Sequence, residues 1–335
     1  MPSKMRRLRG VARTTVLLGA LAVGACGTLF ADPAAAQPEK KLVPIRLSVI
    51  PLLTATPIYI GIKNGYFHDE GIDLVLTKIE GGAPASQAVM SGSLDAAESG
   101  SVPFMIATAR GAKIANVCTF IVMDKKHVLH GIVVRKDSGI KTLADLKGKT
   151  IGVHTLGSIE DIRVRAEVLP SVGLKPADVK IVEVPFSVME GALKTKRVDA
   201  VMPFQPFLQA LVNNPDYMLL SDLNSLVPEG GFPIDTYIFA QSFVDKNPAV
   251  IASFDRAIMK SMKFIEADPQ KAVELVSDSL RFPVELSKQA IGQVPFNVNC
   301  QHDRVSYKNF ADVMKNVSLI PQDYSPEAFL NKPAK

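Results

Sequence analysis

The chain has no tryptophan, only three cysteines, and no long apolar run beyond its first 36 residues. Three cysteines in 335 residues exclude a fold that depends on a dense set of disulfides. No segment after residue 36 approaches the ~20 consecutive apolar residues that a transmembrane helix requires. Some 300 residues remain, enough for two ordinary domains with apolar cores.

Residues 1–36 have the pattern of an export signal. Five basic residues lie within Lys4–Arg13, and the apolar stretch Thr14–Ala25 is too short to span a bilayer. Three alanines before Gln37 fit a signal peptidase site. A lipobox ending at Cys26 is the rival interpretation, and it would leave a lipid anchor on that cysteine. Both interpretations predict an exported, periplasmic protein.

The excess of positive charge belongs to that segment. Removing residues 1–36 takes away five basic residues and one acidic residue, which leaves 33 basic against 32 acidic. No Lys/Arg run or basic patch interleaved with aromatics follows, so a nucleic-acid partner is not expected. Cys118 and Cys300 are then the remaining thiols. Two buried free thiols are the default expectation, although an oxidising compartment leaves pairing open.

The usual catalytic motifs are also missing. The sequence has no GxSxG elbow, no Walker loop and no Rossmann GxGxxG, and its five histidines show no metal-ligand spacing. Cys300, His302 and Asp303 form only an isolated cluster. Asp95 and Asp199 resemble a catalytic pair, but they occupy equivalent places in a repeat, which a repeated turn explains better. No catalytic residue, metal or cofactor is therefore expected.

The chain instead contains an internal repeat with an offset of about 104 residues. Gln87–Ser99 matches Gly191–Pro203, where a helix end leads through a turn into a Leu/Val-Asp-Ala strand. The same offset pairs Arg46–Ile50 with Thr150–His154. A repeat of this length predicts two similar α/β lobes with a cleft between them, and clefts between domains are common ligand sites.

Strand and helix patterns alternate, which favours a mostly parallel sheet flanked by helices in each lobe. The first lobe is expected to comprise residues 42–132 plus 242–330, and the second residues 133–241. Strand patterns at both edges of the second lobe indicate that the chain crosses twice between lobes. Two crossings form a double hinge that allows the lobes to close over a ligand.

Several ordered motifs carry a family resemblance. Ile58–Asp73, Val134–Ile140, Leu143–Val153 and the two Asp-Ala strands resemble solute-binding proteins of ABC importers of the nitrate/sulfonate/taurine class. The resemblance implies a two-lobe type II periplasmic-binding-protein fold and a role in transport. It also implies a monomer that serves a cognate permease and ATPase, with membrane contact only through them or through a lipid at Cys26.

Two departures from the family pattern narrow the class of ligand. Nitrate and bicarbonate binders tend to be longer, and the pyrimidine-precursor binders and their synthase relatives carry a cysteine-rich motif that is missing here. The leading expectation is a small organic anion, either a sulfonate or a carboxylate. The alternatives are a pyrimidine- or flavin-like heterocycle or an amine, a pyrimidine-synthase-type enzyme on the same fold, and a periplasmic sensor without transport.

Ligands of open α/β sheets bind at the carboxyl ends of the strands, which selects particular loops. The loop Thr155–Ser158 combines a glycine, a hydroxyl and a helix start, a combination that binds anions; helix capping by Ser158 is the competing explanation. Phe186 and Phe207 are candidates for an apolar wall. The candidate ligand-binding residues are Thr54, Ala55, Thr56, Gly82, Ser99, Gly100, Ser101, Gly131, Thr155, Gly157, Ser158, Phe186, Gln205, Phe207 and Asp235.

Three acidic residues argue against an anion. Glu98, Glu183 and Asp235 lie in or beside the expected cleft elements. If two of them faced the ligand, they would favour an amine or a neutral polar compound. The competing explanation is a solvated or internally paired carboxylate, so the sequence leaves the charge of the ligand open.

Overall fold

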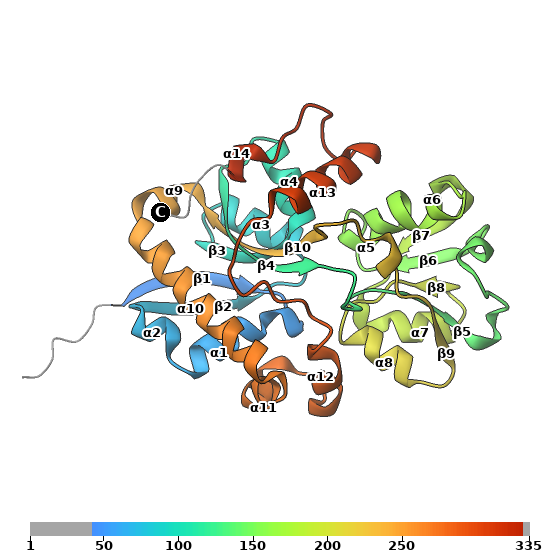
Figure 1. Cartoon of the computed structure of the whole chain (residues 1–335), viewed down its shortest axis with the longest axis horizontal. Helices are drawn as coiled ribbons and strands as arrows, with labels where there is room; N and C mark the ends of the chain where they lie inside the picture. The colour runs from blue at the N-terminus through green and yellow to red at the C-terminus, as the bar shows by residue number, and fades with distance from the viewer. Residues whose placement is uncertain (1–41, 331–335) are drawn as a thin grey trace, which may run out of the picture. The chain divides into compact units, whose positions relative to one another are not determined.

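The first of two five-stranded sheets carries most of the N-terminal part of the chain. The computed structural model describes residues 42–330, so the expected export signal and Cys26 lie outside the described residues. The strand order is β2-β1-β3-β10-β4, and β10 alone runs opposite to its neighbours (Figure 1). The strands are β1 (Val43–Val49), β2 (Ile72–Lys78), β3 (Ala96–Gly100), β4 (Ile114–Met123) and β10 (Phe232–Ala240).

The second sheet repeats this arrangement. Its order is β7-β6-β8-β5-β9, with β5 antiparallel to both of its neighbours. The strands are β5 (Ile132–Arg135), β6 (Thr150–Val153), β7 (Lys180–Glu183), β8 (Ala200–Val201) and β9 (Tyr217–Ser221). β6 takes the place of β1, β8 the place of β3, and β5 the place of β10. The expected α/β fold with mostly parallel sheets is confirmed.

Asp95 and Asp199 show why the repeat is visible in the sequence. The Arg46 N–H donates to Asp95 Oδ2 at 2.9 Å, and the Thr150 N–H donates to Asp199 Oδ2 at 2.8 Å. In return, the backbone N–H of each aspartate donates to the carbonyl oxygen of its partner, at 3.0 and 2.9 Å. Each aspartate therefore holds the start of its own strand against the neighbouring strand, and this role is structural in both lobes.

The strand pairing moves one expected boundary. β10 lies within the range 133–241 expected for the second lobe, but it pairs with β3 and β4 of the first sheet. The chain therefore returns to the first sheet at Phe232. We use "first lobe" and "second lobe" for the two sheets with the helices that contact them.

Helices cover both sheets, and the longest begins with proline in its first turn, as expected. Its residues Phe254, Ile258 and Met262 are buried at helical spacing. α10 packs against α1 and α11, whereas α3, α4 and α13 contact β10 (Figure 1). The helices are α1 (Thr56–Lys63), α2 (Tyr66–Asp69), α3 (Gly82–Met90), α4 (Ser101–Ala109), α5 (Ile159–Arg163), α6 (Leu169–Ser171), α7 (Met189–Lys194), α8 (Phe207–Asn213), α9 (Gln241–Lys246), α10 (Pro248–Ala267), α11 (Pro269–Leu280), α12 (Val284–Ile291), α13 (Arg304–Asn316) and α14 (Glu327–Leu330).

Cys118 and Cys300 form a disulfide, so the expectation of two free thiols is wrong. Cys118 lies in β4 and is fully buried, and Cys300 lies in the segment between α12 and α13. The same segment pairs with β4 at Phe296 and Ile121. The bond therefore fastens a distant segment along the edge of β4, and it removes Cys300 from any metal site.

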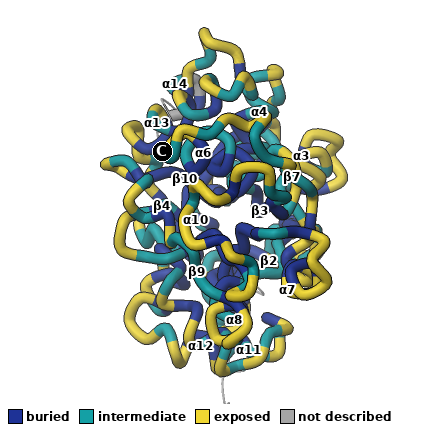
Figure 2. Tube along the Cα trace, turned by 90° about the vertical axis from the view of Figure 1, so that its right-hand side faces the viewer, coloured by how far each residue is buried: buried dark blue, intermediate teal, exposed yellow. Residues whose placement is uncertain are grey.

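The central strands of the first sheet are almost wholly buried. Figure 2 draws β3 and β10 largely in the dark blue of buried residues. One continuous apolar cluster contains side chains from both sheets, among them Leu47, Ile238, Val201 and Val133. Within residues 42–330, no helix is long and apolar enough to cross a membrane.

Candidate functional site: the cleft between the lobes

A cavity of about 80 Å³ lies between loops of the two lobes. The first lobe contributes the segment 50–52 after β1, together with Glu80 and Gly81 before α3. The second lobe contributes His154 after β6, the segment 185–187 after β7, and Phe207 at the start of α8. These loops follow the strand ends of both sheets, which is where the sequence predicts the site.

Aromatic rings form one wall of the cavity. The Phe186 ring stacks on His154 with 4.2 Å between centroids, and it lies 5.8 Å from the Phe207 ring. Phe207 meets Phe282 of the first lobe edge to face at 5.3 Å. The structure thus places the predicted pair Phe186 and Phe207 together in the cleft, and it links that wall to the opposite lobe.

Two buried carboxyl groups lie near the strand ends of the first lobe, and neither of them lines the cavity itself. Glu98 in β3 accepts hydrogen bonds from Thr54 Oγ1 at 2.5 Å and from the Ile50 N–H at 2.9 Å. Ile50 itself lines the cavity. Asp235 in β10 pairs in register with Gly100, at the carboxyl end of β3, and is 7% exposed. Within the described residues, no group donates a hydrogen bond to the Asp235 carboxyl group.

Burial makes ionisation of these carboxyl groups costly. Burial raises the pKa of Glu98 to about 7, even though its two hydrogen bonds act to lower it. Burial also raises the pKa of Asp235 well above its usual range, and the charges of Glu98 and Glu160 raise it further. A ligand that donates hydrogen bonds or carries positive charge would relieve this cost.

The second lobe and the crossing between lobes add another buried pair. His130 Nε2 lies 3.2 Å from Glu160 Oε1, and both side chains are almost fully buried. Burial lowers the pKa of His130, although Glu160 acts in the opposite direction. Burial acts to raise the pKa of Glu160, but the combined effects of His130, Ser158 and His154 lower it. A neutral imidazole therefore lies against a carboxylate.

Several buried polar atoms near these acids have no hydrogen-bond partner. Within the described residues they include the hydroxyls of Tyr59 and Tyr237 and the Nδ1 atoms of His130 and His154. After burial, the Glu98 charge is the next cause that raises the pKa of both tyrosines, so these groups lie in one region. Each unsatisfied atom costs about 1–3 kcal/mol. Since buried polar atoms in folded proteins are normally paired, this region is suited to a ligand that supplies the partners.

The helix start that was expected to bind an anion is occupied by the chain itself. The Leu156 N–H donates to Glu183 Oε1 at 2.8 Å, and the Gly157 N–H donates to Asp161 Oδ2 at 2.9 Å. Ser158 Oγ accepts from the Asp161 N–H at 3.4 Å and so caps α5. Side-chain carboxylates therefore already fill the amide positions that an anionic ligand would need, and Thr155 lies exposed beside them.

Other predicted contacts support the first lobe from within. Thr56 Oγ1 donates to the Leu53 carbonyl oxygen at 2.6 Å, and Ser99 Oγ shares a 3.0 Å hydrogen bond with Ser86. A Cβ on Gly82 would lie 2.7 Å from the Gly100 nitrogen, so only glycine fits there. Buried positions without an observed place in the cavity wall are Thr54, Ala55 and Ser101.

Two further predicted residues hold the crossing between lobes. A Cβ on Gly131 would lie 2.5 Å from Leu219 Cδ1, so the glycine packs against β9. Gln205 Nε2 donates to the Val128 carbonyl oxygen at 3.0 Å. Both residues are buried near the hinge, and neither lines the cavity between the lobes.

The sequence reasoning missed His154, His130, Glu160 and Tyr59 as site residues. His154 could have been found, because the repeat offset places it opposite Ile50 at the end of the first strand of its lobe. The other three stand in ordinary helix and loop contexts. Their proximity depends on how the two lobes meet, which no local pattern records.

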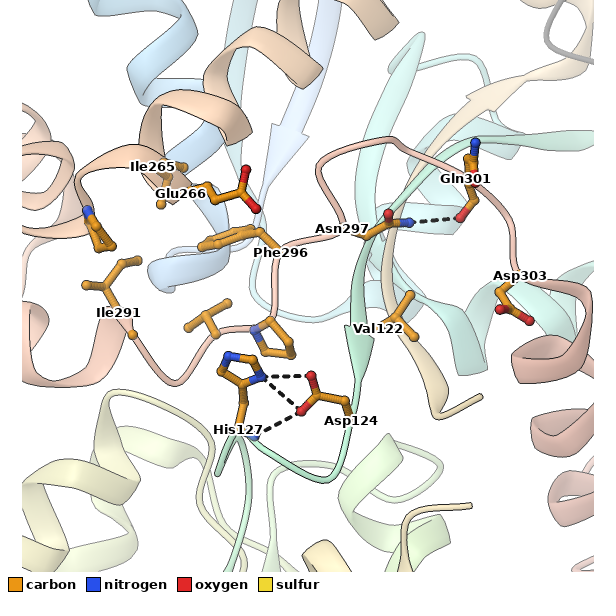
Figure 3. A pocket seen from close by; sticks show the side chains of 14 residues that line it. Val122, Asp124, His127, Ile265, Glu266, Ile291, Phe296, Asn297, Gln301 and Asp303 are labelled. Atoms are coloured by element: carbon orange, nitrogen blue, oxygen red, sulfur yellow. Dashed lines mark hydrogen bonds and ion pairs between the residues drawn. The ribbon is translucent and has the colours of Figure 1, made fainter. Parts of the chain in front are cut away.

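A larger cavity of about 510 Å³ lies outside this cleft, next to the first crossing (Figure 3). Its polar groups mainly bind one another: His127 Nδ1 lies 2.8 Å from Asp124 Oδ2, and Asn297 Nδ2 donates to the Gln301 carbonyl oxygen. It reaches the end of the edge strand β4, where Val122 and Asp124 line it, and it contains no residue of the second sheet. Among residues 42–330, no group of three His, Cys, Asp or Glu side chains is arranged to hold a metal.

Residues 53–272 match the family model described as NMT1/THI5 like. The chain belongs to this family. A protein of Brucella abortus that carries the name of a binding protein is 26% identical over 71% of this chain and 72% of its own length. A yeast protein named 4-amino-5-hydroxymethyl-2-methylpyrimidine phosphate synthase, from Saccharomyces cerevisiae, is 25% identical over 80% of this chain and 81% of its own length.

The fold is that of the periplasmic solute-binding proteins of ABC importers. The periplasmic aliphatic sulphonate binding protein of Escherichia coli superposes with a TM-score of 0.71 and 19% identity, covering 88% of this chain and 91% of that one. The expected family resemblance and two-lobe architecture are therefore confirmed.

Proposed function

We propose that this NMT1/THI5-like protein is the exported solute-binding protein of an ABC importer. It closes its lobes over a small, nitrogen-rich compound that is neutral or positively charged, and it presents the closed form to a membrane permease. The observation that carries the proposal is the set of buried polar atoms without partners near the buried acids, on Tyr59, Tyr237, His130 and His154. The buried carboxyl group of Asp235, which accepts no hydrogen bond within the described residues, adds to it.

The charge of the site favours the heterocycle or amine over the organic anion. At an effective dielectric constant of about 20, one ionised carboxylate ~5 Å from an anionic ligand opposes binding by about 3 kcal/mol. Glu160 is buried in this region with a lowered pKa, and the buried carboxyl groups of Glu98 and Asp235 oppose an anion further whenever they ionise. The helix amides that would offset the repulsion already bind Glu183 and Asp161.

The aromatic wall supports a planar ligand. The rings of Phe186 and His154 stack on each other, and Phe207 packs edge to face against Phe282. An aminopyrimidine-like ring could stack there while its N–H groups donate to Asp235 and its ring nitrogens accept from Tyr59 or Tyr237. Micromolar affinity corresponds to about −8 kcal/mol. A few charge-assisted hydrogen bonds and one buried ring can supply that amount.

Export and partners form the remainder of the proposal. The pattern of residues 1–36 supports secretion to the periplasm, either as a free monomer or with a lipid at Cys26. The permease and its ATPase would be the protein partners.

A thermal-shift panel tests the ligand class. The mature chain, residues 37–335, would be unfolded and refolded without reductant to remove carried-over ligand, and melted with an external dye. The panel holds aminopyrimidines, flavins and amines against sulfonates, carboxylates and nitrate. A ligand at about one hundred times its dissociation constant adds roughly 2.7 kcal/mol, a shift of several degrees. Shifts with aminopyrimidines or amines support the proposal; shifts confined to sulfonates or carboxylates contradict it.

The name of the yeast relative makes a synthase the second candidate. An enzyme would convert a bound pyrimidine precursor, whereas a binding protein would release it unchanged. Mass spectrometry of the hit compound after prolonged incubation separates the two, and any turnover would contradict the binding role.

A further inference from the structure

The largest of the cavities described here, about 900 Å³, lies in the first lobe away from the cleft between the lobes. Its walls come from the open half of the edge strand β4, from α9 and α10, and from the C-terminal segment. The lining includes Ile114, Val117, Ile251, Asp255, Tyr324 and Phe329. A volume in this range accommodates a small organic molecule.

Asp255 is the unusual group in this wall. The side chain lies on α10, the residue is 9% exposed, and Oδ1 is buried with no hydrogen-bond partner within the described residues. Its neighbour Arg256 also lines the cavity but is held in an ion pair by Glu70 at 2.6 Å, so its charge only partly offsets the effect of burial on Asp255. Burial raises the pKa of Asp255 to about 7, so above that pH the cavity contains an unpaired carboxylate.

The other polar groups of the cavity already have partners or lie at its rim. The Tyr324 hydroxyl shares a 2.8 Å hydrogen bond with Thr108. His302 Nδ1 shares a 2.9 Å hydrogen bond with Thr119, and burial lowers the pKa of His302 to about 4, so the ring is neutral. Asp245 is exposed and accepts from Gln241 Nε2 at 2.7 Å.

Lys113, the lysine among the described residues that line the cavity, is exposed and lies directly before β4. Its flexible side chain can remain in water. The inner part of the cavity therefore combines apolar and aromatic surface with one unsatisfied carboxylate, a combination suited to an ammonium group on an apolar body.

We propose that this cavity is a second ligand site, which binds a small organic ammonium compound through Asp255. The ammonium group donates to Oδ1 of Asp255, and the apolar body lies against Ile114, Ile251 and Tyr324. The site is independent of the cleft between the lobes, since the two sites share no lining residue.

The probe is 4-fluorobenzylamine, titrated against the mature chain at about pH 8, where both partners are charged, and followed by fluorine NMR. The wild type should bind it saturably, and Asp255→Asn should weaken binding by about tenfold or more. Asp245→Asn, the matched control at the rim, should change affinity by less than about twofold. The uncharged 4-fluorobenzyl alcohol should bind the wild type weakly. Its affinity should not exceed that of the amine for Asp255→Asn.

Asp255→Asn keeps the shape of the side chain and removes a buried charge, so the variant is expected to fold, and its melting curve verifies this. The proposal is overturned if the wild type shows no saturable binding up to about 10 mM. Equal binding by Asp255→Asn or equal binding of the alcohol would also overturn it.

Discussion

Replacing Cys300 with serine should lower the stability of the protein by a large and calculable amount. The disulfide joins residues that are 182 positions apart and encloses the whole second lobe. Releasing a loop of that length returns chain entropy to the unfolded state worth about 5 kcal/mol at 25 °C, an upper limit in the loop-entropy model. Cys118 is fully buried in β4 and can remain as a buried thiol.

At roughly 2–4 °C per kcal/mol, the melting temperature of Cys300→Ser should fall by about 10–20 °C. The measurement is thermal unfolding of both proteins with an external dye, beside intact-mass analysis. The wild-type mass should be lower than the sequence mass by two hydrogen atoms. The bond should resist mild reductant in the folded state, because Cys300 is only 8% exposed. A melting temperature that falls by less than about 3 °C would refute the entropic reasoning, and a fully reduced wild type would refute the bond itself.

Gly231→Ala should destabilise the chain by roughly 3 kcal/mol or more, because the added Cβ would lie 1.9 Å from the Met123 carbonyl oxygen. The control is Gly92→Ala, also at positive φ but with nothing within 4 Å of the added Cβ. It should lower the free energy of unfolding, measured with denaturant, by only about 1–2 kcal/mol. Equal losses of stability in the two variants would contradict the steric argument. Because the folded-state pKa of Asp255 is raised from 3.8 to about 7, wild-type stability falls as the pH rises through that window. Asp255→Asn should therefore be more stable than the wild type by up to about 4 kcal/mol at about pH 8 and equally stable near pH 4. If the variant were more stable at both pH values, the raised pKa of Asp255 would be refuted as the cause. Phe282→Ala removes the edge-to-face contact with Phe207 between the lobes and should weaken binding of a cleft ligand by up to about tenfold, measured by calorimetry, whereas unchanged affinity would show that the contact does not assist closure.

Much of the fold could be predicted from the sequence, because the repeat records a physical constraint. Asp95 and Asp199 bind the same backbone positions in both lobes, so selection for one strand arrangement leaves the same Asp-Ala pattern twice. The boundary error at β10 has an equally simple cause. A strand that crosses between lobes has the same apolar pattern whichever sheet it joins, and only pairing shows that Phe232–Ala240 belongs to the first.

The loops of the site were predictable but the roles of their residues were not. Strand ends converge by topology, so Phe186, Phe207 and Gly81 could be placed near the cleft. Whether an amide or a hydroxyl is available to a ligand depends on its partners, however. Ser158 and the amides beside it looked free in the sequence, and the structure shows them bound to Asp161 and Glu183. Pairing of Cys118 with Cys300 was unpredictable for the same reason.

The most direct test of the central claim is a calorimetric titration of the stripped mature chain and of Asp235→Asn with the best aminopyrimidine or amine from the panel. The Asp235 carboxyl group is buried and accepts no hydrogen bond within the described residues, so its replacement by an amide should affect the ligand more than the fold. We expect saturable binding by the wild type and a cleft affinity lower by about tenfold or more in Asp235→Asn, with the melting temperature of the free variant maintained. Equal affinity in the two proteins, or binding of sulfonates alone, would contradict the account of a nitrogen-rich ligand held between the lobes.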